Sequence, residues 1–208
     1  MSDFRYYRPE NFPPIVKNLM IMNVLVFLAQ NLLDKQFALT ARFALWPVDS
    51  PFFRPYQIVT HMFSHGSIGH IFFNMFALWM FGKILENVWG PKRFLLFYLV
   101  CGIGAAAAHL AVQYFMGGAG PAVGASGAVM GIMVAFGYLF PNTELFILFI
   151  PFPIKAKWAV IGYVVIDLFG GIARFSGDNI AHFAHLGGAL TGFVLVLFWN
   201  KNNRRGFY

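Results

Sequence analysis

Two short runs rich in small residues carry the side chains best suited to nucleophilic chemistry. The run Gly124-Ala125-Ser126-Gly127 offers a serine, and the run Ala184-His185-Leu186-Gly187-Gly188 offers a histidine. A serine hydroxyl within hydrogen-bond reach of an imidazole is a nucleophile with its general base. Small neighbours let a substrate backbone approach, and a helix that starts at the serine leaves unpaired N–H groups for an oxyanion. Taken singly, each residue also fits a packing role, as does the spacing Gly188-x-x-x-Gly192.

A third polar group lies upstream, where His61, His65, His70 and Asn74 precede and enter an apolar stretch. His70 and Asn74 are four residues apart, so they share one face if the stretch is helical. Two neutral donors on one face could polarise a carbonyl oxygen. The same two residues could instead form a structural hydrogen-bond pair.

The composition indicates the solvent in which these groups must work. Of the 208 residues, 59% are hydrophobic and only 11% are charged, roughly half of the charged fraction in globular domains. Such a chain lacks the polar side chains to cover a soluble domain, whereas a helix needs about 20 mostly apolar residues to cross a bilayer. We therefore expect an all-α polytopic membrane protein without a sizeable soluble domain.

Six apolar segments follow one another along the chain. They are residues 14–33, 67–88, 93–115, 123–140, 156–174 and 179–199. We expect residues 14–199 to form one membrane domain, between an amphipathic tail of residues 1–13 and a basic tail of residues 200–208. The connection 34–66 is rich in Phe, Trp and Pro, which fits the headgroup zone better than water.

The fourth segment is expected to begin below the membrane surface. Between Arg93 and Glu144 no residue is Asp, Glu, Lys or Arg, although a turn exposed to water normally carries a charge. The turn 117–121 lies in this window, and non-helical backbone at membrane depth needs protein or a water-filled cavity around it. Ser126 would then lie in the first helical turn, supplied with water through a polar cavity.

Charge restricts the partners and the location. The net charge is +7, but no basic run with interleaved aromatics points to nucleic acid, and the basic residues gather at the ends of apolar segments. Their distribution favours cytoplasmic termini, and the lack of a transit peptide favours a bacterial plasma membrane. Cys101 is the only cysteine, so no internal disulfide can form.

The polar motifs, in this order, resemble those of the rhomboid family of intramembrane serine proteases. The match consists of H-x4-H-x3-N over 65–74, G-x-S-G over 124–127 and A-H-x-G-G over 184–188. The resemblance implies a six-helix bundle that cleaves single-span membrane proteins near the outer side of the bilayer, without a cofactor or a metal. Substrates would enter sideways from the lipid, past the fifth segment and the loop 116–123.

The resemblance also assigns roles to individual residues. Ser126 would be the nucleophile and His185 the general base, a dyad without an acidic third member. His70 and Asn74 would hold the oxyanion, together with the backbone N–H groups of Ser126 and Ala125.

Other residues would support the site or line its cavity. His65 would be a structural histidine of the outer connection, and Glu86 resembles the family's structural glutamate. The remaining supporting residues are Gly124, Gly127, Met130, His182 and Gly188.

Three positions depart from the family's pattern or fall outside it. Tyr56-Gln57 stands where many relatives have Trp-Arg, so the connection is expected to fold without the usual arginine contacts. Met130 stands where some relatives stack a tyrosine on the base, so the histidine needs another support, such as the methionine thioether. Asp167 has no counterpart in a dyad; we expect it to pair with a polar neighbour or water and assign it no role.

Three other functions compete with that of a protease. A catalytically silent relative would bind membrane clients, but such proteins usually lack the serine or the histidine. A metal-ion carrier could use the histidines as ligands, but no carboxylate or thiolate lies near them in the sequence. A soluble α/β-hydrolase needs glycine two positions after the serine; Ala128 stands there without a preceding strand pattern, and we discard that function.

Overall fold

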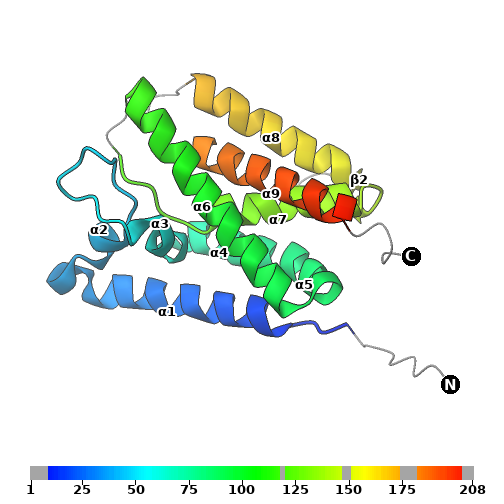
Figure 1. The fold of residues 1–208 in the computed structure, drawn as a ribbon. Helices are drawn as coiled ribbons and strands as arrows, with labels where there is room; N and C mark the ends of the chain where they lie inside the picture. The colour runs from blue at the N-terminus through cyan, green and yellow to red at the C-terminus, as the bar shows by residue number, and fades with distance from the viewer. Residues whose placement is uncertain (1–8, 118–119, 147–150, 174–181, 203–208) are drawn as a thin grey trace.

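The computed structural model describes residues 9–117, 120–146, 151–173 and 182–202, and most of them are helical (Figure 1). Its two short strands form one antiparallel pair, with Glu144 opposite Lys155. The elements in chain order are α1 (Pro14–Phe37), α2 (Leu39–Phe43), α3 (Gln57–Thr60), the 3-10 helix η1 (His61–Phe63), α4 (Ile68–Ala77), the π-helical turn η2 (Leu78–Gly82), α5 (Lys83–Trp89), α6 (Pro91–Met116), α7 (Ser126–Leu139), β1 (Glu144–Leu145), β2 (Ile154–Lys155), α8 (Ala156–Ala173) and α9 (His182–Asn202).

Every predicted apolar segment holds a helix, and the predicted class, an all-α polytopic membrane protein, is confirmed. The second segment is one continuous helical stretch in which η2 joins α4 to α5. Six membrane crossings stay a prediction. Four helices among the described residues are long and apolar enough to cross: Pro14–Phe37, Ile68–Trp89, Pro91–Met116 and His182–Asn200. The predicted domain boundaries also stay a prediction, and residues 1–8 and 203–208 of the two tails lie outside the described residues.

The helix that begins at Ser126 is short. α7 has 14 residues, which corresponds to about 21 Å of helix. The hydrocarbon core of a bilayer is about 30 Å thick. This length fits the expectation that the fourth segment begins below the membrane surface.

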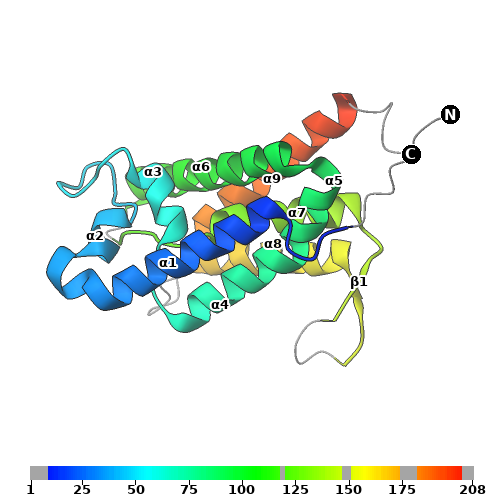
Figure 2. The ribbon, with the colours of Figure 1, turned by 90° about the horizontal axis from the view of Figure 1, so that it is seen from below.

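Large apolar side chains cover the outside of the bundle. Leu32, Ile68 and Phe115 are 79%, 77% and 81% exposed. α1 and α4 run side by side (Figure 2), and a groove of about 570 Å³ between them is lined by apolar and aromatic side chains. Soluble monomers rarely expose contiguous apolar patches larger than a few hundred Å², so this surface suits lipid.

α9 lies at the centre of the C-terminal half, where it packs on α6, α7 and α8 (Figure 1). It meets α7 through glycines: a Cβ on Gly188 would overlap the carbonyl group of Gly127, and a Cβ on Gly192 would lie 2.7 Å from the Cα of Gly131. Small residues four apart let two helix backbones touch in a membrane. The Gly188-x-x-x-Gly192 spacing thus has a packing role, which brings the starts of α7 and α9 together.

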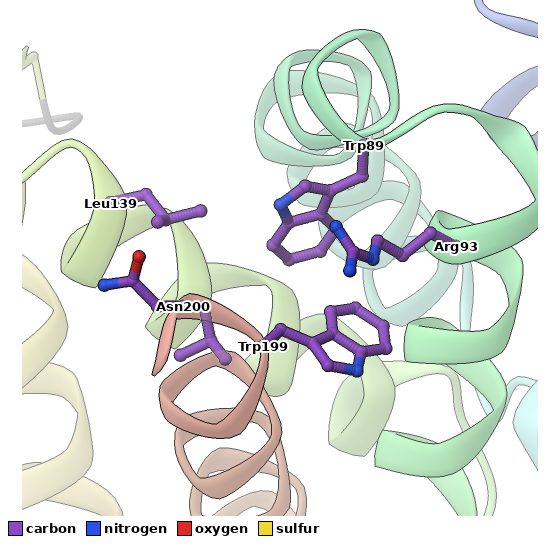
Figure 3. A pocket seen from close by; sticks show the side chains of 6 residues that line it. Trp89, Arg93, Leu139, Trp199 and Asn200 are labelled. Carbon is purple, nitrogen blue, oxygen red and sulfur yellow. The ribbon is translucent and has the colours of Figure 1, made fainter. Parts of the chain in front are cut away.

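The opposite end of the bundle carries an aromatic cluster (Figure 3). Trp89 and Trp199 meet edge to face with 5.6 Å between ring centroids, and the Arg93 guanidinium lies 4.7 Å over the Trp199 ring. A hollow of about 10 Å³ lies among them, next to Leu139 and Asn200. Tryptophan and arginine gathered at helix ends are typical of a membrane–water interface.

Glu86 ties α5 to the beginning of α1. Its carboxylate oxygens accept hydrogen bonds from the backbone N–H groups of Ile15 and Val16 at 2.9 and 2.8 Å. The side chain is 2% exposed. Because the first N–H groups of a helix have no partner within it, a carboxylate there satisfies them and favours the helix dipole. This geometry gives the expected structural glutamate a physical basis.

Glu86→Gln is expected to lower the free energy of unfolding by about 1–3 kcal/mol, because an amide offers one acceptor oxygen for two buried N–H groups. The thermal unfolding midpoint of detergent-purified protein measures the effect. Glu144→Gln, on the exposed strand β1, is the matched control and should leave the midpoint unchanged. Equal midpoints for both variants would mean that the hydrogen bonds to Glu86 do not stabilise the protein.

The connection between α1 and α4 is organised by two buried glutamines. Gln57 accepts hydrogen bonds from the N–H groups of Trp46 and Arg54, and its amide donates to the carbonyls of Arg42 and Phe52. Gln30 of α1 donates to the hydroxyls of Thr40 and Ser64 and accepts from the N–H of His65. The connection therefore folds without the family's arginine, as expected, because one buried amide bonds four backbone groups instead.

Candidate active site

The chain enters α7 through a sharp turn that places Ser126 as the first helical residue. Gly124 has a φ of +124°, a region that only glycine adopts without strain, and its N–H donates to the His61 carbonyl at 2.8 Å. Ala125 caps the helix and is fully buried. The N–H groups of the first turn have no partner within the helix, so they are available close to the Ser126 hydroxyl.

The Ser126 hydroxyl lies against His185, although the two residues are 59 positions apart. The distance from Ser126 Oγ to His185 Nε2 is 2.7 Å, a full hydrogen bond. His185 is in the first turn of α9 and is 8% exposed. This is the geometry that a nucleophile and its general base require, and the two polar runs of the sequence are brought together as expected.

Asp167 joins the same site from α8. Both of its carboxylate oxygens lie 3.1 Å from His185 Nδ1, and Oδ1 also lies 2.7 Å from His182 Nδ1. The expectation that Asp167 pairs with a polar neighbour holds, but that neighbour is the histidine at the centre of the site. A carboxylate in a membrane helix is costly and marks a functional site by default; that signal was present in the sequence.

The support that His185 was expected to need comes from this carboxylate. Met130 is 2% exposed, one turn after Ser126, and it belongs to the buried face of α7. His182, expected to support the site or line its cavity, bonds Asp167 through its ring, and lining of a cavity stays a prediction.

His70 approaches Ser126 from α4. A Cβ placed on Gly124 would lie 2.7 Å from His70 Nε2 and 3.6 Å from Ser126 Oγ, so the imidazole and the hydroxyl border the same small space. His70 Nδ1 accepts a long hydrogen bond of 3.4 Å from the N–H of Gly66, which leaves Nε2 to carry the proton into that space. Asn74 donates to the His70 carbonyl at 2.9 Å and so uses one amide hydrogen within α4.

His65 lies behind His70 in the loop before α4. The two ring centroids are 5.0 Å apart, edge to face. Burial, and to a smaller extent the charge of His70, lower the pKa of His65 to about 4. His65 is therefore neutral at neutral pH and supports His70 by packing. Burial also lowers the pKa of His61, whose Nδ1 lies 2.8 Å from the Gln57 carbonyl.

The predicted entry route is described in part. α8 is described, whereas residues 118–119 of the loop 116–123 lie outside the described residues. Leu45 and Ala122 exchange two backbone hydrogen bonds, which tie this loop to the connection before α3. Entry of substrates past α8 and the loop stays a prediction.

The molecule is a polytopic helical membrane protein in which a serine, a histidine and an aspartate form one hydrogen-bonded row. The Rhomboid domain model matches residues 53–201, well over half of the chain. The chain belongs to the rhomboid family, as the motifs predicted.

Similar proteins come from animals, fungi and plants. The human presenilin-associated rhomboid-like protein, mitochondrial, is 32% identical over 187 residues, 89% of this chain and 48% of that protein. Rhomboid protein 1, mitochondrial, of Saccharomyces cerevisiae is 31% identical over 153 residues, 70% of this chain and 42% of that protein. RHOMBOID-like protein 12, mitochondrial, of Arabidopsis thaliana is 30% identical over 209 residues, 93% of this chain and 60% of that protein. The chain thus spans about half the length of the curated relatives it matches.

These relatives contradict the predicted location. A bacterial plasma membrane with both termini cytoplasmic was expected, but all three proteins are mitochondrial by name. The prediction failed because a charge bias orients helices without identifying the membrane. The apparent lack of a transit peptide was equally uninformative, since the relatives extend well beyond the matched region.

Proposed function

We propose that this chain is an intramembrane serine endopeptidase that cleaves single-span membrane proteins, with Ser126 as nucleophile and His185 as general base. One observation carries the proposal: the 2.7 Å contact between Ser126 Oγ and His185 Nε2. Membership of the rhomboid family supports it. Gly124 supports it further, because the absence of a Cβ there leaves room for the His70 ring beside the serine.

The first half of the reaction forms an acyl-enzyme. The Ser126 proton moves to His185 Nε2 while Oγ attacks the carbonyl carbon of the scissile peptide bond. The carbonyl π electrons move onto oxygen and give a tetrahedral oxyanion. When these electrons re-form the C=O bond, the C–N bond breaks, and the proton on His185 Nε2 passes to the leaving amine.

The second half restores the enzyme. Water attacks the ester carbon while His185 Nε2 takes one of its protons, and a second oxyanion forms. Its collapse breaks the bond to Oγ, which regains its proton from Nε2. The products are one carboxylic acid and one amine fragment, so one water is consumed and the protein is unchanged.

The oxyanion would lie in the space that Ser126 borders with His70. Donors to it are the N–H groups at the start of α7 and His70 Nε2, whose place beside Gly124 supports this role. Donors that are already in place stabilise charge as it develops and need no reorganisation. Asn74 is the weaker candidate, because one of its amide hydrogens is used on the His70 carbonyl.

His70→Phe is therefore expected to lower kcat by about 10²-fold, the usual effect of removing one oxyanion donor. Asn74→Ala should cost less. KM should change little in both variants, because the donors act on charge that appears only in the transition state. Wild-type kcat in His70→Phe would remove this residue from the oxyanion site.

The substrates would be proteins with one membrane-spanning helix. A helix hides its peptide bonds in its own hydrogen bonds, so a cleavable segment should contain small or helix-weakening residues near the cut. The family resemblance implies this preference. Water would reach the site through a polar cavity at the end of the bundle where α7 begins.

Reconstitution with a single-span reporter tests the proposal against a catalytically silent relative that binds membrane clients. Wild-type protein in liposomes should yield two fragments, and Ser126→Ala should yield none. A reporter that binds wild-type protein but stays intact would favour the silent relative. Elemental analysis of purified protein tests the metal-carrier alternative, for which the described residues offer no group of three ligands.

A further inference from the structure

We propose that Asp167 is a positioning residue for the general base, so that Ser126, His185 and Asp167 act as a row of three. The proposal rests on the proposed protease function, in which His185 takes the proton of Ser126. It extends that function, because Asp167 would act only through the imidazole. The observation behind it is a carboxylate on the far side of the ring from the serine.

The contact between Asp167 and His185 has a geometry that can orient the imidazole ring. Both oxygens of Asp167 lie 3.1 Å from His185 Nδ1, and Nε2 of the same ring lies 2.7 Å from Ser126 Oγ. The two ring nitrogens are thus occupied at once. Three helices supply the row, since the serine is on α7, the histidine on α9 and the aspartate on α8.

Asp167 is a buried carboxylate, and burying a charge costs free energy. The residue is 3% exposed, and its carboxylate oxygens contact the imidazoles of His182 and His185. Leaving a carboxylate buried costs several kcal/mol unless it is paired and hydrogen-bonded. Helix packing alone needs no carboxylate at this position, and a hydrophobic residue would fill it at lower cost.

The carboxylate selects the tautomer that catalysis needs. An ionised carboxylate only accepts hydrogen bonds, so His185 Nδ1 must carry a proton to bond it. In the neutral ring Nε2 is then unprotonated and can take the proton of Ser126. With the opposite tautomer, Nε2 would already hold a hydrogen and could not act as the base.

The same carboxylate stabilises the charged ring that forms next. When the Ser126 proton reaches Nε2, the imidazole becomes a cation with Asp167 in contact. The aspartate keeps its charge and takes no proton, as in soluble serine proteases. The proton and charge balance of the proposed reaction is therefore unchanged, while the intermediate is held in place.

His182 fixes the carboxylate in turn. Its Nδ1 lies 2.7 Å from Asp167 Oδ1, at the start of α9 and one turn before His185. A carboxylate with two donors has less freedom to rotate than one with a single donor. In Asp167→Asn, His182 therefore determines which way the amide group faces.

Asp167→Asn is expected to change KM little and to lower kcat by up to about 10⁴-fold, the loss that the same change causes in a soluble triad. The amide oxygen should accept from His182, which turns the NH₂ toward His185 Nδ1 and forces the proton onto Nε2. Asp167→Glu, which keeps the charge, should retain more kcat than Asn. Asp49→Asn, an exposed carboxylate, is the matched control and should behave as wild type.

A second substitution separates positioning from a merely structural tie between α8 and α9. In Asp167→Asn with His182→Phe, the amide oxygen is released and can accept from His185 Nδ1. Positioning predicts that the double variant recovers part of the kcat lost in Asp167→Asn. A structural tie predicts further loss of activity together with a lower thermal midpoint, and that result would overturn the proposal.

A measurement on the wild-type protein decides the matter even if the Asp167 variants fail to fold. In ¹⁵N-histidine-labelled wild type, with His185 assigned by the loss of its signal in His185→Gln, the proton should reside on Nδ1. A neutral ring protonated on Nε2 would overturn the proposal. The two proposals fail separately: cleavage by Ser126→Ala ends the protease function, whereas wild-type kcat in folded Asp167→Asn ends only the role of Asp167.

Discussion

Replacing Ser126 by alanine or His185 by glutamine should each lower cleavage of a reconstituted single-span substrate by at least about 10⁴-fold. Alanine removes the attacking oxygen, and glutamine keeps a polar side chain that cannot accept and return the proton. Because the two residues act as one unit, the double variant should be no slower than either single variant. Fragment appearance over time, quantified on gels, measures the effect.

His109→Gln is the matched control for the histidine, since His109 is a partly buried histidine of α6 outside the row of three. It should cleave as wild type does. Additive losses in the Ser126 and His185 double variant would contradict the proposed pairing. So would a His185→Gln variant that keeps most of its activity.

Gly188→Ala is expected to have the second largest effect, although the residue does no chemistry. A Cβ there would overlap the carbonyl group of Gly127, so α9 must move away from α7. His185 lies one turn before Gly188, and the shift would separate it from Ser126. A displacement of about 1 Å can cost about 10² in rate, and overpacking typically costs about 1–3 kcal/mol of stability.

Both effects can be measured on one preparation. The cleavage rate per folded molecule should fall by about 10²-fold or more, and the thermal midpoint should fall with it. Gly162→Ala on α8 is the matched control, because a Cβ there meets nothing within 4 Å. Equal cleavage rates in the two variants would mean that the close approach of α7 and α9 does not position the site.

Much of the fold could be predicted because lipid imposes a simple rule. Apolar stretches must satisfy their backbone internally, so runs of the right length became helices. Irregular features were not predictable in the same way. The π-helical turn over Leu78–Gly82 and the division of residues 34–66 into α2, α3 and η1 depend on tertiary contacts, such as those of Gln57, that no local pattern records.

The site was predicted where its residues lie in short motifs and missed where they do not. Ser126 and His185 stand in glycine-rich runs, and the structure brings them into contact. Asp167 stands alone in an apolar helix, and only the packing of α8 on α9 reveals its partners. The free-energy cost of a carboxylate in a membrane helix was the available signal, but it does not identify the residues that the carboxylate contacts. A role for Met130 beside the imidazole, suggested by a family position, stays a prediction.

The most direct test is covalent labelling of the reconstituted wild-type protein with a serine-directed phosphonate, mapped by mass spectrometry. We predict one adduct, on Ser126, that is absent in Ser126→Ala and forms at least about 10²-fold more slowly in His185→Gln, because the general base is gone. An adduct on a different serine, or an unchanged rate without the histidine, would contradict the account.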